Sequence, residues 1–422
     1  MVNTRGIKMK VFKYLVLTII SLLSILILWI NIKLHSINNS FSDKEKDISL
    51  QLNFLEYELK SNNLGVRMQQ VFPEGFVFIN AIYGLTWCEL AMADSLNGPK
   101  IKERALKEAI FAYNAINSKM AKSNFEKKLD PEYGIFYAGW KNYLLSKILS
   151  IDTTFIGHQA IIDSFKYQCN VIKNTLVTSK SPFLQSYDSH SWPADMFVAI
   201  ASLSNHDKIF SPLYKSEINK WLNQVKNKID PLTLMVPHKV DSRTGELIQG
   251  TRGCSMSLIL RMLGEINSDF SKNQFDLFKQ NFVTTTFGLP SVREYPKGNS
   301  GFGDIDSGPV IFGVGFTATI AMIGPFSMYG YEDLADNQYK TVNAFGFSFK
   351  DKIQKKYLLG KLPMADAFIV WGRATGLKNA PPTNVNSPWS LTLKFHLISL
   401  LTLTIFWAIF FLGRFIINSL LS

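Results

Sequence analysis

One loop, with the sequence REYPKGNSGFGDIDSGPV, brings acidic, basic and glycine residues together directly before an apolar run. Its three carboxylates belong to Glu294, Asp304 and Asp306. The glycines between them permit backbone shapes that other residues resist, so the loop can fold tightly. We expect it to present Asp304 and Asp306 at the start of a helix. Asp306 or Ser307 would be the N-cap and Pro309 would lie in the first turn, which leaves one aspartate free for chemistry.

Cleavage of a glycoside typically uses two carboxyl groups, one on each side of the bond that breaks. One carboxyl donates a proton and the other acts as a base or a nucleophile, with the two about 5 to 10 Å apart. The candidates for this pair are Asp304 or Asp306 with Asp195 or Asp188, and Glu294 is held in reserve.

Aromatic and cationic side chains lie in or next to the same loops. An aromatic ring can stack on a sugar face, and arginine or histidine can bind hydroxyls or a carboxylate. The structural alternative is that the rings pack in the core and that Arg252 only neutralises the acids around it. The substrate-binding candidates are Trp192, Tyr187, Tyr295, Tyr137, His190, Arg252, Arg293 and Glu74.

The sequence carries no signature of a cofactor or metal site. The segment GNSGFG lacks the Lys-Ser/Thr of a phosphate loop, and no H-E-x-x-H or C-x-x-C occurs. Clustered acids suit calcium in kind, but no EF-hand spacing is present. Cys88, Cys169 and Cys254 are too few and too far apart for a zinc site or a disulfide framework, so we expect buried thiols. His238 has no partner at ligand spacing and is expected to be a loop histidine.

Two uncharged apolar segments, 14–32 and 395–413, lie near the ends of the chain. Each is long enough to cross a bilayer as a helix. A cleaved signal peptide is the alternative for the first segment, and a buried core helix for the second. We expect two membrane spans, which places both termini on the same side.

The basic residues before the first span predict its orientation. Arg5, Lys8, Lys10 and Lys13 precede it with no acid among them. By the positive-inside rule the termini are cytoplasmic and the bulk of the chain lies outside the cytoplasm, in the periplasm if the host is a bacterium. The net charge is +12, but the basic residues are scattered among acids. This pattern argues against nucleic acid and suits a surface near anionic lipid or acidic glycan.

Between the spans the apolar residues recur with a helical period and almost no strand alternation, so we expect an all-α fold. Segments rich in small and aromatic residues open after Pro or Gly turns and start 53 to 63 residues apart. This spacing indicates a repeated pair of helices, with amphipathic outer helices between the apolar inner ones. The segment 48–62 is expected to pair with the last inner helix. The six inner helices are expected to start at Phe76, Gly134, Ser191, Cys254, Ser307 and Pro363.

In period and helix character the sequence resembles the six-hairpin, or (α/α)6, toroid superfamily, which includes glycoside hydrolases, polysaccharide lyases and sugar epimerases. The stretches SWPADMFVAIASL, GTRGCSMSLILRML and REYPKGNSGFGDIDSGP also resemble those of uncharacterised membrane-anchored bacterial proteins of this fold. The resemblance implies a fold more than a reaction. An open α-solenoid is the alternative architecture.

In the toroid the long connections lead into the inner helices and meet at one opening. Acids stand at these helix starts, among them Glu74, Asp195, Asp306 and Asp366. We therefore expect them to surround one site. The expected organisation is 1–13 cytoplasmic, 14–32 membrane span, 44–378 toroid domain, 379–393 linker and 395–413 membrane span.

Together these features predict a membrane-anchored, extracytoplasmic, glycan-active enzyme, most simply glycoside hydrolase-like, with no cofactor and no metal. Its partners would be a glycan or another small-molecule substrate and membrane lipid, not nucleic acid. A non-catalytic protein that binds a glycan or a lipid-linked precursor is one alternative. An isomerase or dehydratase acting on a small apolar molecule is another, and an apolar mouth reached by a cysteine would favour it.

Overall fold

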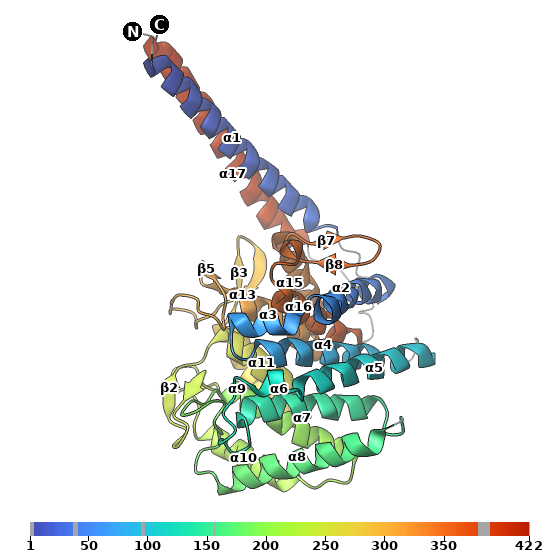
Figure 1. The fold of residues 1–422 in the computed structure, drawn as a ribbon. Coiled ribbons are helices and arrows are strands. Elements are labelled where there is room, and N and C mark those ends of the chain that lie inside the picture. Colours follow the sequence, from blue (N-terminus) through green and yellow to red (C-terminus); the bar gives the residue numbers. More distant parts are fainter. Residues whose placement is uncertain (1–3, 37–40, 94–97, 156, 379–388, 422) are drawn as a thin grey trace.

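The computed structural model describes residues 4–36, 41–93, 98–155, 157–378 and 389–421. A body made mostly of helices carries a stalk of two long helices (Figure 1). The described strands form only short two-stranded antiparallel hairpins, so the mostly helical prediction is confirmed. The body helices are α2 (Phe41–Ser61), α3 (Leu64–Val71), α4 (Gly75–Met92), α5 (Gly98–Ile116), α6 (Lys119–Lys122), α7 (Gly134–Ile151), α8 (His158–Thr178), α9 (Pro193–Ile209), α10 (Lys215–Lys226), α11 (Gly253–Ile266), α12 (Ser268–Asn281), α13 (Phe316–Ala321), α14 (Ile323–Met328), α15 (Glu332–Phe345), η1 (Leu358–Gly360), α16 (Pro363–Thr375) and η2 (Gly376–Lys378). The strands are β1 (Lys239–Val240), β2 (Leu247–Gln249), β3 (Val283–Thr286), β4 (Leu289–Val292), β5 (Val310–Ile311), β6 (Val314–Gly315), β7 (Phe349–Lys350) and β8 (Lys355–Lys356).

The stalk consists of α1 (Thr4–Lys33) and α17 (Trp389–Leu421), which lie side by side with both chain ends at the far tip (Figure 1). Their apolar stretches, Val11–Lys33 and Thr392–Ile416, are 23 and 25 residues long and almost entirely exposed. Length, composition and exposure indicate two membrane spans. Residues 379–388 of the expected linker lie outside the described residues, as do residues 1–3.

Polar side chains join the two stalk helices. Asn31 donates a hydrogen bond to Ser399 (3.0 Å), and the Trp407 indole donates one to Ser24 (3.2 Å). Apolar packing alone distinguishes poorly between positions along two such helices, whereas polar pairs specify which residues face each other. The hydrogen bonds therefore hold the stalk in one antiparallel register.

The inner helices are apolar nearly all round and are buried accordingly. α4 is long and apolar enough to cross a membrane, yet 83% of it is buried in the body, so it is a core helix. It packs against α7 and α16, α7 packs against α9, and α9 packs against α11. α11 contacts α13 and α14, and both of these contact α16. The chain of contacts therefore returns to its starting helix.

An amphipathic helix covers each inner position. The pairs are α5 on α4, α8 on α7, α10 on α9, α12 on α11, α15 on α14 and α2 on α16. The prediction that segment 48–62 pairs with the last inner helix is confirmed, because that segment lies in α2.

The fifth inner helix begins later than predicted. The segment from Ser307 forms the β5–β6 hairpin, and the helix starts at Phe316. Gly308 and Phe312 have positive φ angles of 62° and 52°, which a right-handed helix excludes. The prediction that Asp306 or Ser307 caps this helix is therefore wrong.

Replacing Gly84 with leucine should destabilise the inner layer. Gly84 lies where α4 meets α5 and α7, and a Cβ atom there would come within 2.9 Å of the Ala112 Cβ and 3.0 Å of a Leu144 methyl. We expect Gly84→Leu to lower the free energy of unfolding by about 1–3 kcal/mol, measured by thermal unfolding of the full chain in detergent. Gly413→Leu on α17 is the control, because its Cβ would meet no atom within 4 Å. Equal melting of the two variants would contradict the packing argument.

Candidate functional site

The connections that lead into α9, α11 and α13 lie on one flank of the body, at the left in Figure 1. They contain the β1–β2, β3–β4 and β5–β6 hairpins. A backbone bridge joins Ser191 to Val240, and the Gly253 N–H donates to the Glu294 carbonyl (2.8 Å), so loops from different repeats form one surface.

Arg252, the residue before α11, links two acids on this flank. Its Nε donates to Glu294 (2.8 Å), and its Nη atoms donate to both carboxylate oxygens of Asp304 (2.5 and 3.0 Å). The guanidinium also lies over the Tyr295 ring, 5.5 Å from its centre. Arg252 and Glu294 are buried. Such paired, charge-assisted bonds hold all three side chains in one geometry.

The two acids bound to Arg252 have opposite electrostatic surroundings. Burial raises the pKa of Glu294, and the bonds it accepts from the Cys254 thiol (3.0 Å) and from Arg252 offset this only in part. Burial would also raise the pKa of Asp304, but Arg252 and the backbone N–H of Ser307 outweigh it and hold that pKa well below its usual range. Asp304 is therefore firmly ionised.

Asp304 also positions Asp306. One of its oxygens accepts the backbone N–H groups of Asp306 (3.2 Å) and Ser307 (3.0 Å), which closes a tight turn. An oxygen of Asp306 lies 4.0 Å from Nε2 of His238. Burial among the loops, followed by repulsion from Asp304 and Glu74, raises the pKa of Asp306 to about 6. Half of this side chain still faces solvent.

Asp195 lies in the first turn of α9 and is only 8% exposed. The Ser186 hydroxyl donates a bond of 2.6 Å to it. Burial raises the pKa of Asp195 to about 8, and repulsion from Glu74 and Asp306 adds to the effect against the opposing Ser186 bond. Asp195 thus carries a proton near neutral pH.

An aromatic group stands next to these acids. The Tyr187 hydroxyl donates to Glu74, and the Tyr187 ring meets the Trp192 ring edge-on at 5.4 Å. His190 stacks on Trp192 at 5.8 Å, and the Lys239 ammonium lies 4.9 Å from the centre of the indole. We call Glu74, Asp195, Glu294, Asp304 and Asp306 the acid cluster.

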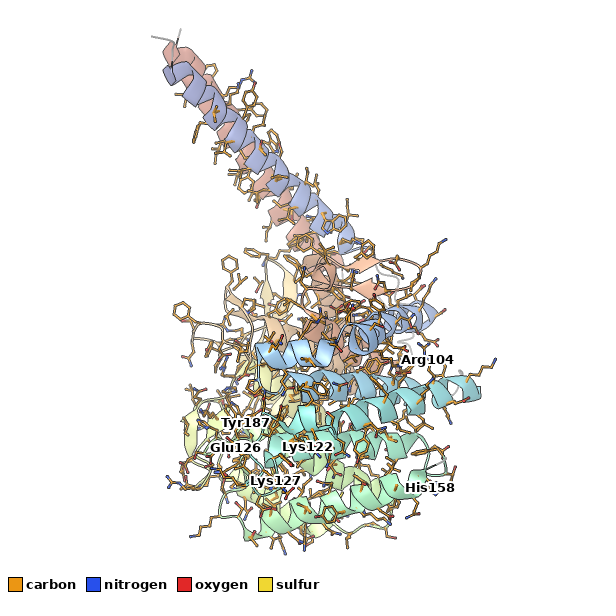
Figure 2. All side chains as sticks on the ribbon, viewed as in Figure 1. Arg104, Lys122, Glu126, Lys127, His158 and Tyr187 are labelled. Atoms are coloured by element: carbon orange, nitrogen blue, oxygen red, sulfur yellow. The ribbon has the colours of Figure 1, made fainter. Side chains whose placement is uncertain are left out.

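Asp188 points elsewhere. Its carboxylate pairs with Lys128 (2.8 Å) on the exposed surface, and its backbone N–H donates to Glu126. Figure 2 shows Tyr187 beside Glu126 on this flank. Asp366 is also separate from the cluster. It is fully buried and accepts the backbone N–H of Tyr357, the residue that follows β8 (3.0 Å).

Two further candidates have structural partners. Tyr137 is buried in the core and donates its hydroxyl to the carbonyl of Ile116 (3.1 Å). Arg293 donates to the carbonyls of Tyr295 (3.1 Å) and Asn299 (2.8 Å), so it braces the glycine-rich loop.

Sequence reasoning missed the part of His238 in this network. His238 is buried, hydrogen-bonds Ser255, and lies 3.4 Å from Nη1 of Arg252. Burial and the charge of Arg252 lower its pKa to about 3, so it is neutral. Cys254 is a buried thiol as predicted, but its bond to Glu294 was not foreseen. No sequence motif signals these contacts, because His238 lies 14 residues from Arg252 and 17 from Ser255, and Cys254 lies 40 residues from Glu294.

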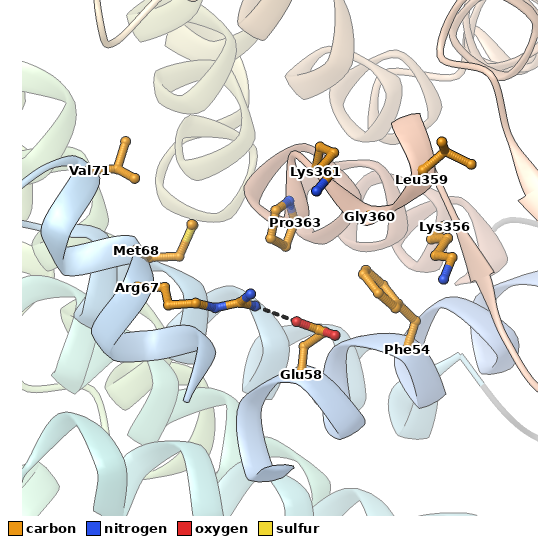
Figure 3. Close-up of a pocket in the computed structure, with 10 residues that line it drawn as sticks. All are labelled: Phe54, Glu58, Arg67, Met68, Val71, Lys356, Leu359, Gly360, Lys361 and Pro363. Atoms are coloured by element: carbon orange, nitrogen blue, oxygen red, sulfur yellow. Dashed lines mark hydrogen bonds and ion pairs between the residues drawn. The ribbon is translucent and has the colours of Figure 1, made fainter. Parts of the chain in front are cut away.

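Two surface hollows lie away from the acid cluster. One, of about 270 Å³, opens between α2, α3 and η1, where Arg67 pairs with Glu58 (Figure 3). The other, of about 330 Å³, lies between α11, α12 and α14. Neither is lined by an acid of the cluster. Asp304 and Asp306, with side chains 46% and 50% exposed, face solvent directly.

A comparison with protein-family models finds no match, and a comparison with curated proteins finds no similar sequence.

Removing Arg252 should unfold this flank. Arg252→Met leaves Glu294 buried without its cation, and we expect a loss of about 3–5 kcal/mol in the free energy of unfolding. The double variant Arg252→Met with Glu294→Gln should recover much of that loss, because no charge then stays buried. Denaturant unfolding of the full chain measures both variants. An Arg252→Met protein as stable as the parent would refute the proposed role of the pair.

Asp195 should make stability depend on pH. Between its ordinary pKa of 3.8 and its folded pKa of about 8, the folded protein binds a proton that the unfolded chain releases, so stability falls as the pH rises through this range. Asp195→Asn should therefore gain roughly 2–4 kcal/mol relative to the parent between about pH 5 and about pH 8. Melting curves across this range test it. Asp188→Asn, on the exposed surface, is the control and should show no such gain.

Proposed function

We propose that this protein is a membrane-tethered, extracytoplasmic, glycan-active enzyme of the glycoside hydrolase type, built on an (α/α)6 toroid. The cyclic order of inner-helix contacts, each covered by one outer helix, supports the toroid. In an open solenoid the last inner helix would not contact the first, whereas α16 contacts α4. The six-hairpin resemblance of the sequence supports the same architecture.

The orientation rests on the charges at the stalk tip. Both termini lie at that tip (Figure 1), and Arg5, Lys8, Lys10 and Lys13 lie in or next to it. The positive-inside rule assigns this tip to the cytoplasm, so the body faces outward. A polymer of the cell envelope would be within reach of an enzyme tethered there.

The observation that supports hydrolysis is the separation of pKa values within one acid cluster. Burial raises the pKa of Asp195 to about 8, so this carboxyl can donate a proton to the oxygen of the leaving group. Burial raises the pKa of Asp306 to about 6. This carboxyl is therefore largely ionised at neutral pH and can act as the base or the nucleophile. Carboxyls kept in different protonation states by their surroundings are the arrangement that glycoside cleavage uses. Asp304, bound to Arg252, would position Asp306 by accepting its backbone N–H, and its negative charge helps to raise the pKa of Asp306.

The aromatic group next to the cluster suits a sugar. Trp192 presents an indole flanked by His190 and Lys239, which can stack on a sugar face and bind hydroxyls or an acidic substituent. The solvent-facing side chains of Asp304 and Asp306 suit a large polymer better than a small apolar molecule. Cys254 is buried against Glu294 among charged groups, so the isomerase alternative lacks the apolar mouth it requires.

A non-catalytic glycan-binding protein is the second candidate. Glu294 and Asp304 are both engaged by Arg252, as in a structural ion-pair network. On this alternative Trp192 and its neighbours bind the sugar, and the acids only hold the loops.

Carboxylate substitutions distinguish the two candidates. We expect the full chain in detergent to cleave members of a glycan library, and Asp195→Asn and Asp306→Asn to lower turnover by roughly 10²–10⁴-fold. Asp188→Asn is the matched control and should keep the parent rate. Binding without cleavage by the parent, unchanged in Asp306→Asn, would favour the second candidate.

A further inference from the structure

Two hairpins at the base of the stalk have phenylalanine at their tips. Phe287 and Gly288 connect β3 to β4, and Phe312 and Gly313 connect β5 to β6. All four residues have positive φ angles, from 52° to 87°, as in a type I′ turn. Asn-Gly or Asp-Gly is the usual pair in such turns, and a bulky residue is strained there. Both phenylalanines are nevertheless exposed, by 48% and 74%.

A third exposed phenylalanine group follows α15. Phe345, Phe347 and Phe349 are each more than 40% exposed, and Phe347 also has a positive φ of 46°. The Phe345 ring meets the ring of Phe395 on α17 at 6.1 Å. The Phe287 and Phe312 rings meet each other at 5.4 Å. We call Phe287, Phe312, Phe345, Phe347 and Phe349 the phenylalanine collar.

The collar lies level with the ends of the two spans. Leu289 of β4 and Ala344 of α15, next to collar residues in the chain, form one buried cluster with Ile30 of α1 and Phe395 of α17. Ile30 and Phe395 are each three residues inside the apolar stretch of their span, which is about 5 Å along a helix. The body surface at the collar therefore reaches the depth at which the membrane spans begin.

We propose that the phenylalanine collar is a lipid-contact surface that inserts at the boundary between headgroups and acyl chains of the bilayer crossed by α1 and α17. Exposure of large apolar side chains to water is unfavourable. The bilayer that α1 and α17 cross is an apolar phase at the level of these side chains. Aromatic and basic groups favour the same level of a membrane, and Trp29, Lys33 and Lys394 lie there on the stalk. Contact with lipid would explain why phenylalanine occupies these turn positions despite the backbone strain.

Lipid contact on several sides of the stalk would fix the orientation of the body against the membrane. Asp306 and Phe312 are six residues apart, so Asp306 would lie within about 20 Å of the level at which Phe312 inserts. This inference does not depend on the proposed reaction, because it rests on the hairpin tips and the stalk alone.

Fluorescence quenching by lipid tests the collar. Phe312→Cys and Phe287→Cys, each made in the full chain and labelled with an environment-sensitive fluorophore, are reconstituted in lipid nanodiscs with and without lipids carrying a doxyl quencher near the headgroup. We expect blue-shifted emission and a loss of intensity when the quencher is present. The parent, whose three cysteines are buried, supplies the labelling blank.

The control is Leu232→Cys, a position 71% exposed in the connection after α10, and α10 lies at the end of the body away from the stalk (Figure 1). Its label should show no loss of emission to the doxyl lipid. Labels at positions 312 and 287 that behave like the one at 232 would overturn the proposal. Energy transfer between collar labels on two chains in one nanodisc, without quenching by lipid, would also overturn it and identify a second copy as the occupant.

Discussion

Arg252 is buried where three parts of the chain meet: the start of α11, the segment just after β4 through Glu294, and the glycine-rich loop through Asp304. A guanidinium out of water needs carboxylates within bonding distance, and a buried carboxylate needs a cation or several donors. The position of the loop is therefore set by the requirements of one cation. The glycines allow this closeness, since a Cβ on Gly303 would lie 2.1 Å from the Gly308 carbonyl oxygen.

The same burial separates the protonation states around the site. The bonds from Arg252 keep Asp304 ionised, and its negative charge is one reason why Asp306 holds a proton more strongly than a free aspartate. The carboxyl of Asp195, almost without solvent, accepts a hydrogen bond from a neutral hydroxyl, that of Ser186. Arg252 thus keeps Asp304 ionised while burial keeps Asp195 protonated on the same flank, which is the chemical basis of the proposed hydrolysis.

The stalk and the site are connected through short hairpins. β4 packs on the base of the stalk through Leu289 and ends two residues before Glu294. The β5–β6 hairpin pairs with the loop of Arg293 and carries Phe312 toward the membrane. The phenylalanine collar and the acid cluster are therefore joined by a few residues of paired backbone.

The sequence by itself determined the helices and the spans, because these depend on local composition. Five inner helices begin within two residues of their predicted starts, and the apolar ends form two exposed helices. The fifth inner helix was misjudged because Gly308 and the Phe312-Gly313 turn favour a hairpin that apolar content alone does not reveal. The tertiary structure alone decided which side chains meet. Asp195, Asp304, Asp306, Glu294 and Glu74 share one flank, whereas Asp188 turns to Lys128 and Tyr137 enters the core. The physical reason is that hydrogen bonds and charges act over a few ångströms in space, and loops far apart in the chain set those distances.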